Sequence, residues 1–149
     1  MNDHDETTKV TIPNHRKTIK KGEFSNDEKL LAVEMPDSVT VIKEGAFWHC
    51  VNLEKVKLSS KLKSIETLAF GDCYKLKSIT LPEGLERIGV SAFSKCFQLE
   101  SIVIPKSVRI LEDYAFDKCD GLRLVKMPAE TQVLGTVFHD TYNLTIEYY

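Results

Sequence analysis

The sequence lacks any long hydrophobic run. None of its apolar stretches approaches the roughly 18 residues that a membrane-spanning helix needs. The first ten residues, MNDHDETTKV, are polar and acidic, and they lack the basic-then-apolar layout of a secretion signal. We therefore expect no membrane span and no export directed by this chain.

An excess of charge of either sign is also missing. The 20 Lys and Arg residues are balanced by 22 Asp and Glu residues, for a net charge of -2. A nucleic-acid-binding domain normally carries a basic footprint, so nucleic acid is not an expected partner. Apolar residues at 42% and charged residues at 28% are typical of a globular protein.

Motifs of known chemistry are absent as well. The sequence contains no glycine-rich phosphate loop, no G-x-S-x-G and no H-E-x-x-H. The four histidines (His4, His15, His49 and His139) are scattered, and none stands at metal-ligand spacing with another His or with Cys. We expect no enzymatic activity, no cofactor and no metal site.

What the sequence does contain is an internal repeat of 23 residues. Each of three residue types keeps its own place in that period, and Ser59 fills the one place where a proline is missing. The members are Pro13, Pro36, Pro82, Pro105 and Pro128; Cys50, Cys73, Cys96 and Cys119; and Phe24, Phe47, Phe70, Phe93 and Phe116, with Phe138 following after 22 residues. These are all the prolines and all the cysteines of the chain, so the repeat is a strong signal of a stacked architecture.

The shared pattern is L-x-x-I-x-[IL]-P-x-x-[VL]-x-x-I-x-x-x-A-F-x-x-C, which is clearest in residues 76–98 and 99–121. This pattern resembles the BspA-like class of leucine-rich repeats, and the resemblance covers residues 10–149. It implies a solenoid of a class often found on cell surfaces or secreted, in adhesion and host-interaction roles.

Read physically, each repeat begins with a period-2 stretch that predicts a strand with one buried face, ended by a proline that cannot continue a sheet. The rest of the repeat returns the chain to the next parallel strand. We predict a β-rich repeat solenoid, a right-handed leucine-rich-repeat coil with one short parallel strand per turn. We expect helical or 3₁₀ turns around the A-F pairs and a second short strand on the convex side. Residues 1–9 are expected to form a disordered polar tail, and residues 10–149 one domain of about six repeats plus a terminal strand.

The four cysteines present three alternatives. Equivalent positions lie one rung apart, about 4.8 Å, which falls within the range of a disulfide. Four ligands spread over three rungs span about 14 Å, too far for one zinc ion. Free Cys packs as a small apolar group, and we favour a buried thiol ladder beside Phe47, Phe70, Phe93 and Phe116. In such a slot a serine is expected to cost more stability than an alanine.

The outward side of the strands forms the candidate binding surface, because solenoids use such extended faces for binding. The predicted binding residues alternate along successive strands: Lys55, Lys57, Ser78, Thr80, Ser101, Val103, Leu124 and Lys126. Lysines at positions 9, 55, 57 and 126 oppose only Glu34 on this face, which favours a partner protein with an acidic or polar surface. A plain solvated sheet is the alternative.

The expected function is non-catalytic binding of a protein of unknown identity. An intracellular scaffold remains an alternative to the cell-surface role, since the lack of a signal and the free cysteines favour a cytoplasmic location. The terminal strand in residues 144–149 has an unpaired edge, and we expect weak self-association through it.

Overall fold

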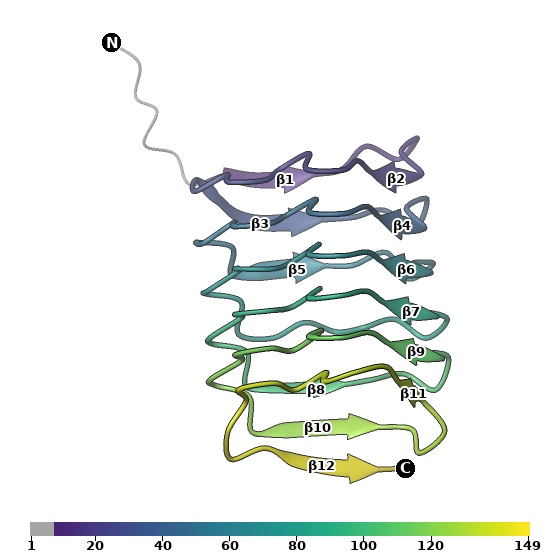
Figure 1. Cartoon of the computed structure of the whole chain (residues 1–149). Coiled ribbons are helices and arrows are strands. Elements are labelled where there is room, and N and C mark those ends of the chain that lie inside the picture. The colour runs from purple at the N-terminus through teal and green to yellow at the C-terminus, as the bar shows by residue number, and fades with distance from the viewer. Residues whose placement is uncertain (1–7) are drawn as a thin grey trace.

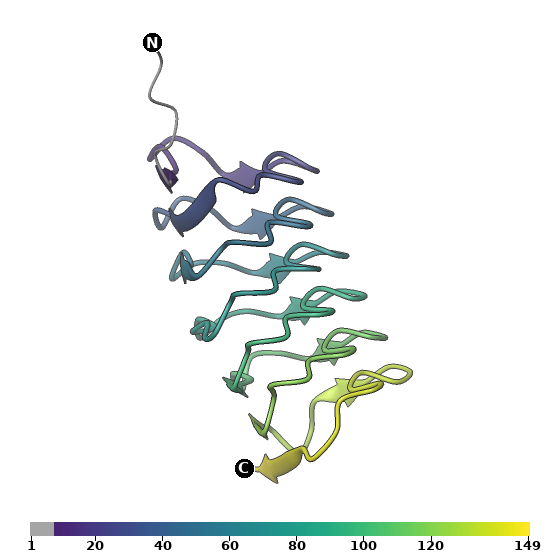
Figure 2. The same ribbon diagram turned by 90° about the vertical axis from the view of Figure 1, so that its left-hand side faces the viewer.

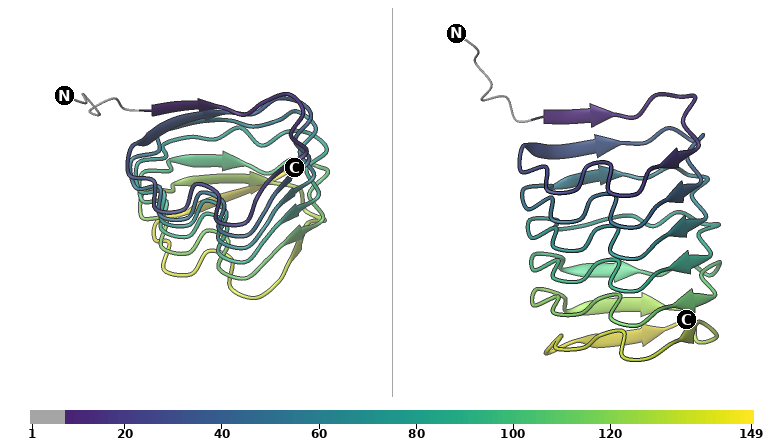
Figure 3. Two further views of the ribbon diagram at one scale, coloured as in Figure 1. Left: turned by 90° about the horizontal axis from the view of Figure 1, so that it is seen from above. Right: turned by 45° about the horizontal axis from the view of Figure 1, so that its top comes forward.

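The chain forms a β-solenoid of about six turns with parallel strands (Figure 1), as the repeat predicted. The structure is a computed structural model and describes residues 8–149. Residues 1–7 of the predicted tail lie outside the described residues, whereas Thr8 and Lys9, which the sequence assigned to the tail, belong to the first strand. Seen down the solenoid axis, the turns superimpose as a stack of loops (Figure 3, left).

One side of the stack, here called the strand face, carries the strands that precede the prolines. They form two three-stranded parallel sheets, β1-β3-β5 and β8-β10-β12. Their bounds are β1 (Thr8–Thr11), β3 (Leu30–Glu34), β5 (Lys55–Lys57), β8 (Ser101–Val103), β10 (Leu124–Met127) and β12 (Thr145–Tyr148). Their inward residues, such as Val33, Ile102 and Val125, are buried.

The second short strands predicted on the convex side are also present. They form one uninterrupted six-stranded parallel sheet, here called the second sheet. Its members are β2 (Thr18–Ile19), β4 (Val41–Ile42), β6 (Ser64–Ile65), β7 (Arg87–Ile88), β9 (Ile110–Leu111) and β11 (Gln132–Val133). Partners in successive turns are in register, as in Ile42 with Ile65 and Ile65 with Ile88.

The third side, here called the turn side, contains the A-F segments, which are β-turns rather than the expected helical or 3₁₀ turns. In each segment a residue on either side of the Phe has a left-handed backbone, as in Leu68 (φ 56°) and Asp72 (φ 59°) around Phe70. Left-handed residues break a right-handed helix, and the segment is instead bonded to its neighbours. The Phe70 amide, for example, donates to the Ala92 carbonyl of the next turn at 2.8 Å. Figure 2 shows these loops stacked along the solenoid.

The core is a set of ladders that run the length of the stack. The Phe rings stack from Phe24 to Phe138 with centroids 5.1 to 5.7 Å apart. All four cysteines are buried free thiols, as predicted. Burial raises the pKa of Cys50 and of Cys119 to about 12, and it raises the pKa of Cys73 and of Cys96 well above the usual value.

The thiols also form hydrogen bonds, which the sequence did not indicate. Each Cys donates to the Phe carbonyl of the preceding turn, as in Cys96 Sγ to Phe70 O at 3.3 Å. In the last turn Thr141 takes the place of Cys, and its hydroxyl donates to Phe116 O at 2.8 Å. The side chain at this repeat position therefore acts as a hydrogen-bond donor to a Phe carbonyl. In the last turn that donor is already a hydroxyl, that of Thr141.

This donor role reverses the expected order of two substitutions. We predict that Cys96→Ser destabilises the protein less than Cys96→Ala, because serine can still donate to the Phe70 carbonyl, with both costs within about 2 kcal/mol. Equilibrium denaturation of the two variants measures the difference. The opposite order would mean that the apolar character of the slot outweighs its hydrogen bond.

Candidate functional site

The strand face carries the predicted binding residues on its outward side. Register in the N-terminal sheet places Lys55 beside Ala32, and Lys57 beside Glu34. Glu34 bonds Lys57 on one side at 3.2 Å and Lys9 on the other at 3.2 Å. The hydrogen bond from Lys57, followed by that from Lys9, lowers the pKa of the Glu34 carboxyl. Two of the lysines counted as free positive charges therefore share one carboxylate, which offsets one of their two charges.

The C-terminal sheet is less basic than the sequence suggested. Lys126 lies in register with Glu147 of β12 and forms an ion pair with it at 3.4 Å. Glu147 was not counted in the predicted face, which thus holds four lysines against two glutamates. Val103 is 54% exposed, while the neighbouring Leu124 is half-buried. An apolar contact point on this face is therefore provided mainly by Val103.

Ser78 and Thr80 are exposed as predicted, but they do not lie on a strand. The two sheets of the strand face end at β5 and resume at β8, and within residues 8–149 the segment from Ser78 to Leu81 makes no hydrogen bond to either neighbour. Figure 1 shows this turn without an arrow between β5 and β8.

The interruption is confined to the strand face. On the convex side the fourth turn pairs with both neighbours through β7, and there a Cβ atom on Gly89 would lie 2.8 Å from the backbone of Glu66 and Thr67. The glycine thus permits a close approach of the third and fourth turns on the convex side. On the strand face the same two turns are not bonded, so the stack is open there.

A hollow of about 570 Å³ lies at this opening. It is lined by Ser78–Glu83, Ser101–Val103 and Pro105. Four of these are predicted binding residues: Ser78, Thr80, Ser101 and Val103. Its lining is mixed: apolar side chains such as Val103 stand beside the hydroxyls of Ser78 and Ser101 and the unpaired backbone N–H and C=O groups of the fourth turn, which are free donors and acceptors.

A second hollow, of about 410 Å³, adjoins the opening at the start of the strands. It is lined by Glu54, Lys55, Lys75, Lys77, Ser78 and Gln98. Among the described residues, none of the three lysines forms an ion pair, in contrast to Lys57 and Lys126.

Lys75 and Lys77 were missed by sequence reasoning because they precede the alternating stretch. The 23-residue period could have indicated them, because it places Lys75 and Lys77 one turn after Asn52 and Glu54, next to Lys55.

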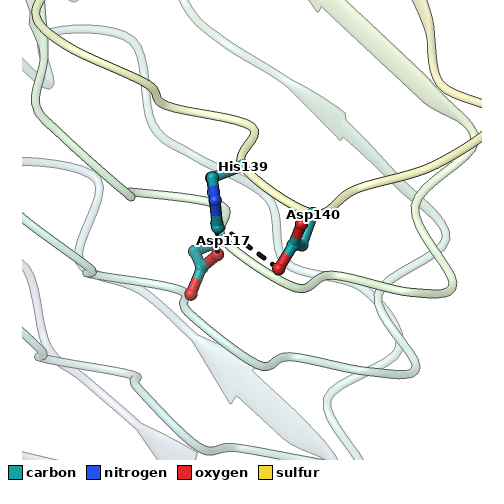
Figure 4. Close-up of side chains that lie close together, drawn as sticks. All are labelled: Asp117, His139 and Asp140. Carbon is teal, nitrogen blue, oxygen red and sulfur yellow. Dashed lines mark hydrogen bonds and ion pairs between the residues drawn. The ribbon is translucent and has the colours of Figure 1, made fainter.

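The turn side brings one histidine together with carboxylates, which the scattered positions in the sequence did not suggest. His139 lies between Asp117 of the preceding turn and its own neighbour Asp140 (Figure 4). Their ligand atoms all lie within 4.8 Å of one another. The sequence analysis considered only His and Cys as companions of a histidine, so it did not find the carboxylates beside His139.

Comparisons with known proteins agree with this architecture. A family model described as BspA type leucine rich repeat region matches residues 2–145 in six copies. A leucine rich cell surface protein from Faecalibacterium prausnitzii is 38% identical, with a TM-score of 0.78 over 82% of this chain and 32% of that one. The chain thus spans about a third of that protein.

Two further solved structures share the fold. The T. pallidum leucine rich repeat protein is 26% identical with a TM-score of 0.81, covering 92% of this chain and 78% of that one. The pneumococcal vaccine antigen PcpA has a TM-score of 0.86 over 98% of this chain and 37% of that one, at 21% identity, and this likeness shows the fold alone. A search of curated proteins gives no match. No helix in residues 8–149 is long and apolar enough to span a membrane.

The opening at the fourth turn predicts a local difference in hydrogen exchange. Amides of Ser78–Leu81 should exchange at least about tenfold faster than those of β7 in the same turn, because β7 is bonded within the second sheet. Exchange measured by NMR resolves the two segments. Equal protection would mean that the strand face is closed in solution.

Proposed function

Since the chain belongs to the BspA-type leucine-rich repeat family, we propose that it is a non-catalytic binding module whose strand face binds an acidic segment of a partner protein. The observation that carries this proposal is a set of three lysines around the hollow at the opening of the strand face, Lys55, Lys75 and Lys77, which form no ion pair within residues 8–149. A lysine already paired with a glutamate has to lose that contact before it can bind a partner, whereas a lysine without an ion pair can bind a partner at no such cost.

Electrostatics and geometry both favour this use of the surface. The net charge of the chain is -2, so a local group of free lysines stands out against an acidic background and would steer an acidic partner to the strand face. The lysines stand on a stacked backbone, so the spacing of their Cα atoms is largely fixed before binding and little backbone entropy is lost. Val103, exposed at the edge of the neighbouring hollow, supplies an apolar contact beside them.

The setting of this binding has two candidates. A cell-surface or secreted role in adhesion is supported by the family and by the cell-surface protein from Faecalibacterium prausnitzii. An intracellular scaffold is supported by the four free thiols, since unpaired cysteines are typical of a reducing compartment. The strand face serves the same purpose in either setting.

Charge reversal at the free lysines tests the proposed surface. We expect Lys55→Glu combined with Lys77→Glu to weaken binding of a fluorescein-labelled oligoglutamate peptide by about tenfold at low ionic strength and by less at high ionic strength, because salt screens exposed charges. Fluorescence anisotropy measures the affinity, and circular dichroism checks that the fold is kept.

A matched control carries the same change of charge elsewhere. Lys20 and Lys118 are exposed and lie outside the strand face, without ion pairs among the described residues. Lys20→Glu combined with Lys118→Glu should retain most of the affinity. Equal losses in the two double variants would mean that the peptide responds to net charge alone, and the strand face would then have no special role.

The edge of β12 is the proposed site of weak self-association. Within residues 8–149, β12 pairs only with β10. The amides of Thr145 and Tyr149 donate to that neighbour, so the amides of Ile146 and Tyr148 point to the open edge. We expect Tyr148→Pro to abolish dimers seen by sedimentation at high concentration, because proline removes an outward N–H. Tyr148→Phe should leave them intact. A wild-type chain that stays monomeric would contradict the proposal.

A further inference from the structure

The cluster of Asp117, His139 and Asp140 lies on the turn side, and Figure 4 shows the three side chains close together. Asp117 follows Phe116 in the fifth turn, and His139 and Asp140 follow Phe138 in the sixth. Both carboxylates approach the same imidazole nitrogen, with Asp117 Oδ1 at 2.8 Å and Asp140 Oδ2 at 3.6 Å from His139 Nδ1. We infer that these three residues form a binding site for a single zinc ion.

The distances between the ligand atoms suit that ion. Ligand atoms about 2.1 Å from a tetrahedral zinc lie roughly 3.4 Å from one another. All three atoms here already lie within 4.8 Å of each other, so an ion can replace the imidazole proton with small side-chain movements. Water would fill the fourth position, since the cluster is partly exposed.

Groups outside the cluster hold each ligand in place. The hydroxyl of Ser94 lies 3.4 Å from Asp117 Oδ2, and the hydroxyl of Tyr142 donates to Asp140 Oδ1 at 3.0 Å. Each contact takes the carboxylate oxygen that faces away from the imidazole, so the other oxygen stays directed at Nδ1. The Tyr114 ring meets the imidazole edge-on at 5.5 Å. Such outer contacts are typical of metal sites, where they orient the ligands.

A second cluster on the turn side, one position further from the stacked Phe, provides an internal comparison. His49 pairs with Asp72 at 3.3 Å, and Asp72 in turn lies 3.9 Å from the ammonium of Lys95. That cluster contains one carboxylate and a lysine, so its charges balance without an added ion. At His139 there are two carboxylates and no lysine amine in an ion pair with them among the described residues. The excess of carboxylates there favours a bound cation.

The position of Asp140 explains the difference. In the 23-residue period it corresponds to Lys95 and Lys118 of the preceding turns, so an aspartate stands where those turns have a lysine. The ligand set of one imidazole nitrogen and two carboxylate oxygens favours zinc over magnesium and calcium, which prefer oxygen ligands alone. The resulting site is independent of the proposed binding of an acidic partner.

Isothermal titration of the untagged chain with zinc chloride tests the inference. We expect one zinc ion to bind with micromolar affinity. His139→Gln should weaken that affinity at least about tenfold, as should Asp140→Lys, which recreates the charge pattern around His49. His49→Gln is the matched control and should bind zinc as the wild type does.

A third variant and a second measurement protect the test against misfolding. Asp140→Asn keeps an oxygen for the Tyr142 hydroxyl and removes only the charge, and it too should bind zinc more weakly. In the unaltered protein, NMR should show zinc-induced changes of the His139 ring signals and none at His49. Absence of zinc binding by the wild type, or unchanged binding by His139→Gln, would overturn the inference.

Discussion

The structure depends on one constraint, which is that each turn must satisfy its backbone hydrogen bonds with the turns above and below. A 23-residue segment cannot close a sheet or bury an apolar face alone, so order comes only from stacking. The same relation holds on three sides. Strands pair on the strand face and in the second sheet, and on the turn side amides such as Phe70 N bond carbonyls such as Ala92 O of the next turn. The buried ladders of Phe and Cys follow from this registration, because equivalent side chains are brought to the same place in every turn.

Because the turns are hydrogen-bonded to one another on three sides, one turn can lose its backbone hydrogen bonds on one side and still keep its place in the solenoid. The fourth turn does so on the strand face, where Ser78–Leu81 is unbonded, while β7 and the Phe93 ring keep the turn in place through the second sheet and the core. Free backbone groups in the interior of a sheet are costly unless water or another polar group meets them. The opening therefore marks the part of the strand face where a partner gains most from supplying donors and acceptors, and it lies beside the lysines without ion pairs.

Much of the fold could be predicted from the sequence, because the ladders depend on residue type at a fixed period. The buried Cys50 and Phe70, the two kinds of strand and the outward Lys55 follow from that period alone. The rest depends on contacts between turns, which the period does not specify. Whether Lys57 forms an ion pair depends on Glu34 in the neighbouring turn. The ion pair of Lys126 depends on Glu147, which lies in register with it because the last turn is shorter than 23 residues. The left-handed backbone at Leu68 was likewise hidden, since neither glycine nor asparagine marks it. The opening at Ser78 has no sequence signal, because its residues match the repeat as well as any.

Because contacts in the stack are almost all between neighbouring turns, surface chemistry can change one turn at a time. The positions directly after the stacked Phe illustrate this. His49, Asp72 and Lys95 each stand two residues after the Phe of their turn, whereas Asp117 and His139 stand one residue after it and Asp140 stands two. Neighbouring positions of one repeated backbone thus hold clusters that differ in charge. The backbone bond from Lys118 N to His139 O is kept while the side chains acquire a different chemistry. A solenoid of this kind thus holds its surface groups at fixed intervals and leaves their identity free, so that a lysine-lined strand face and a cluster of metal-ligating residues can exist on separate sides of one short stack without affecting each other.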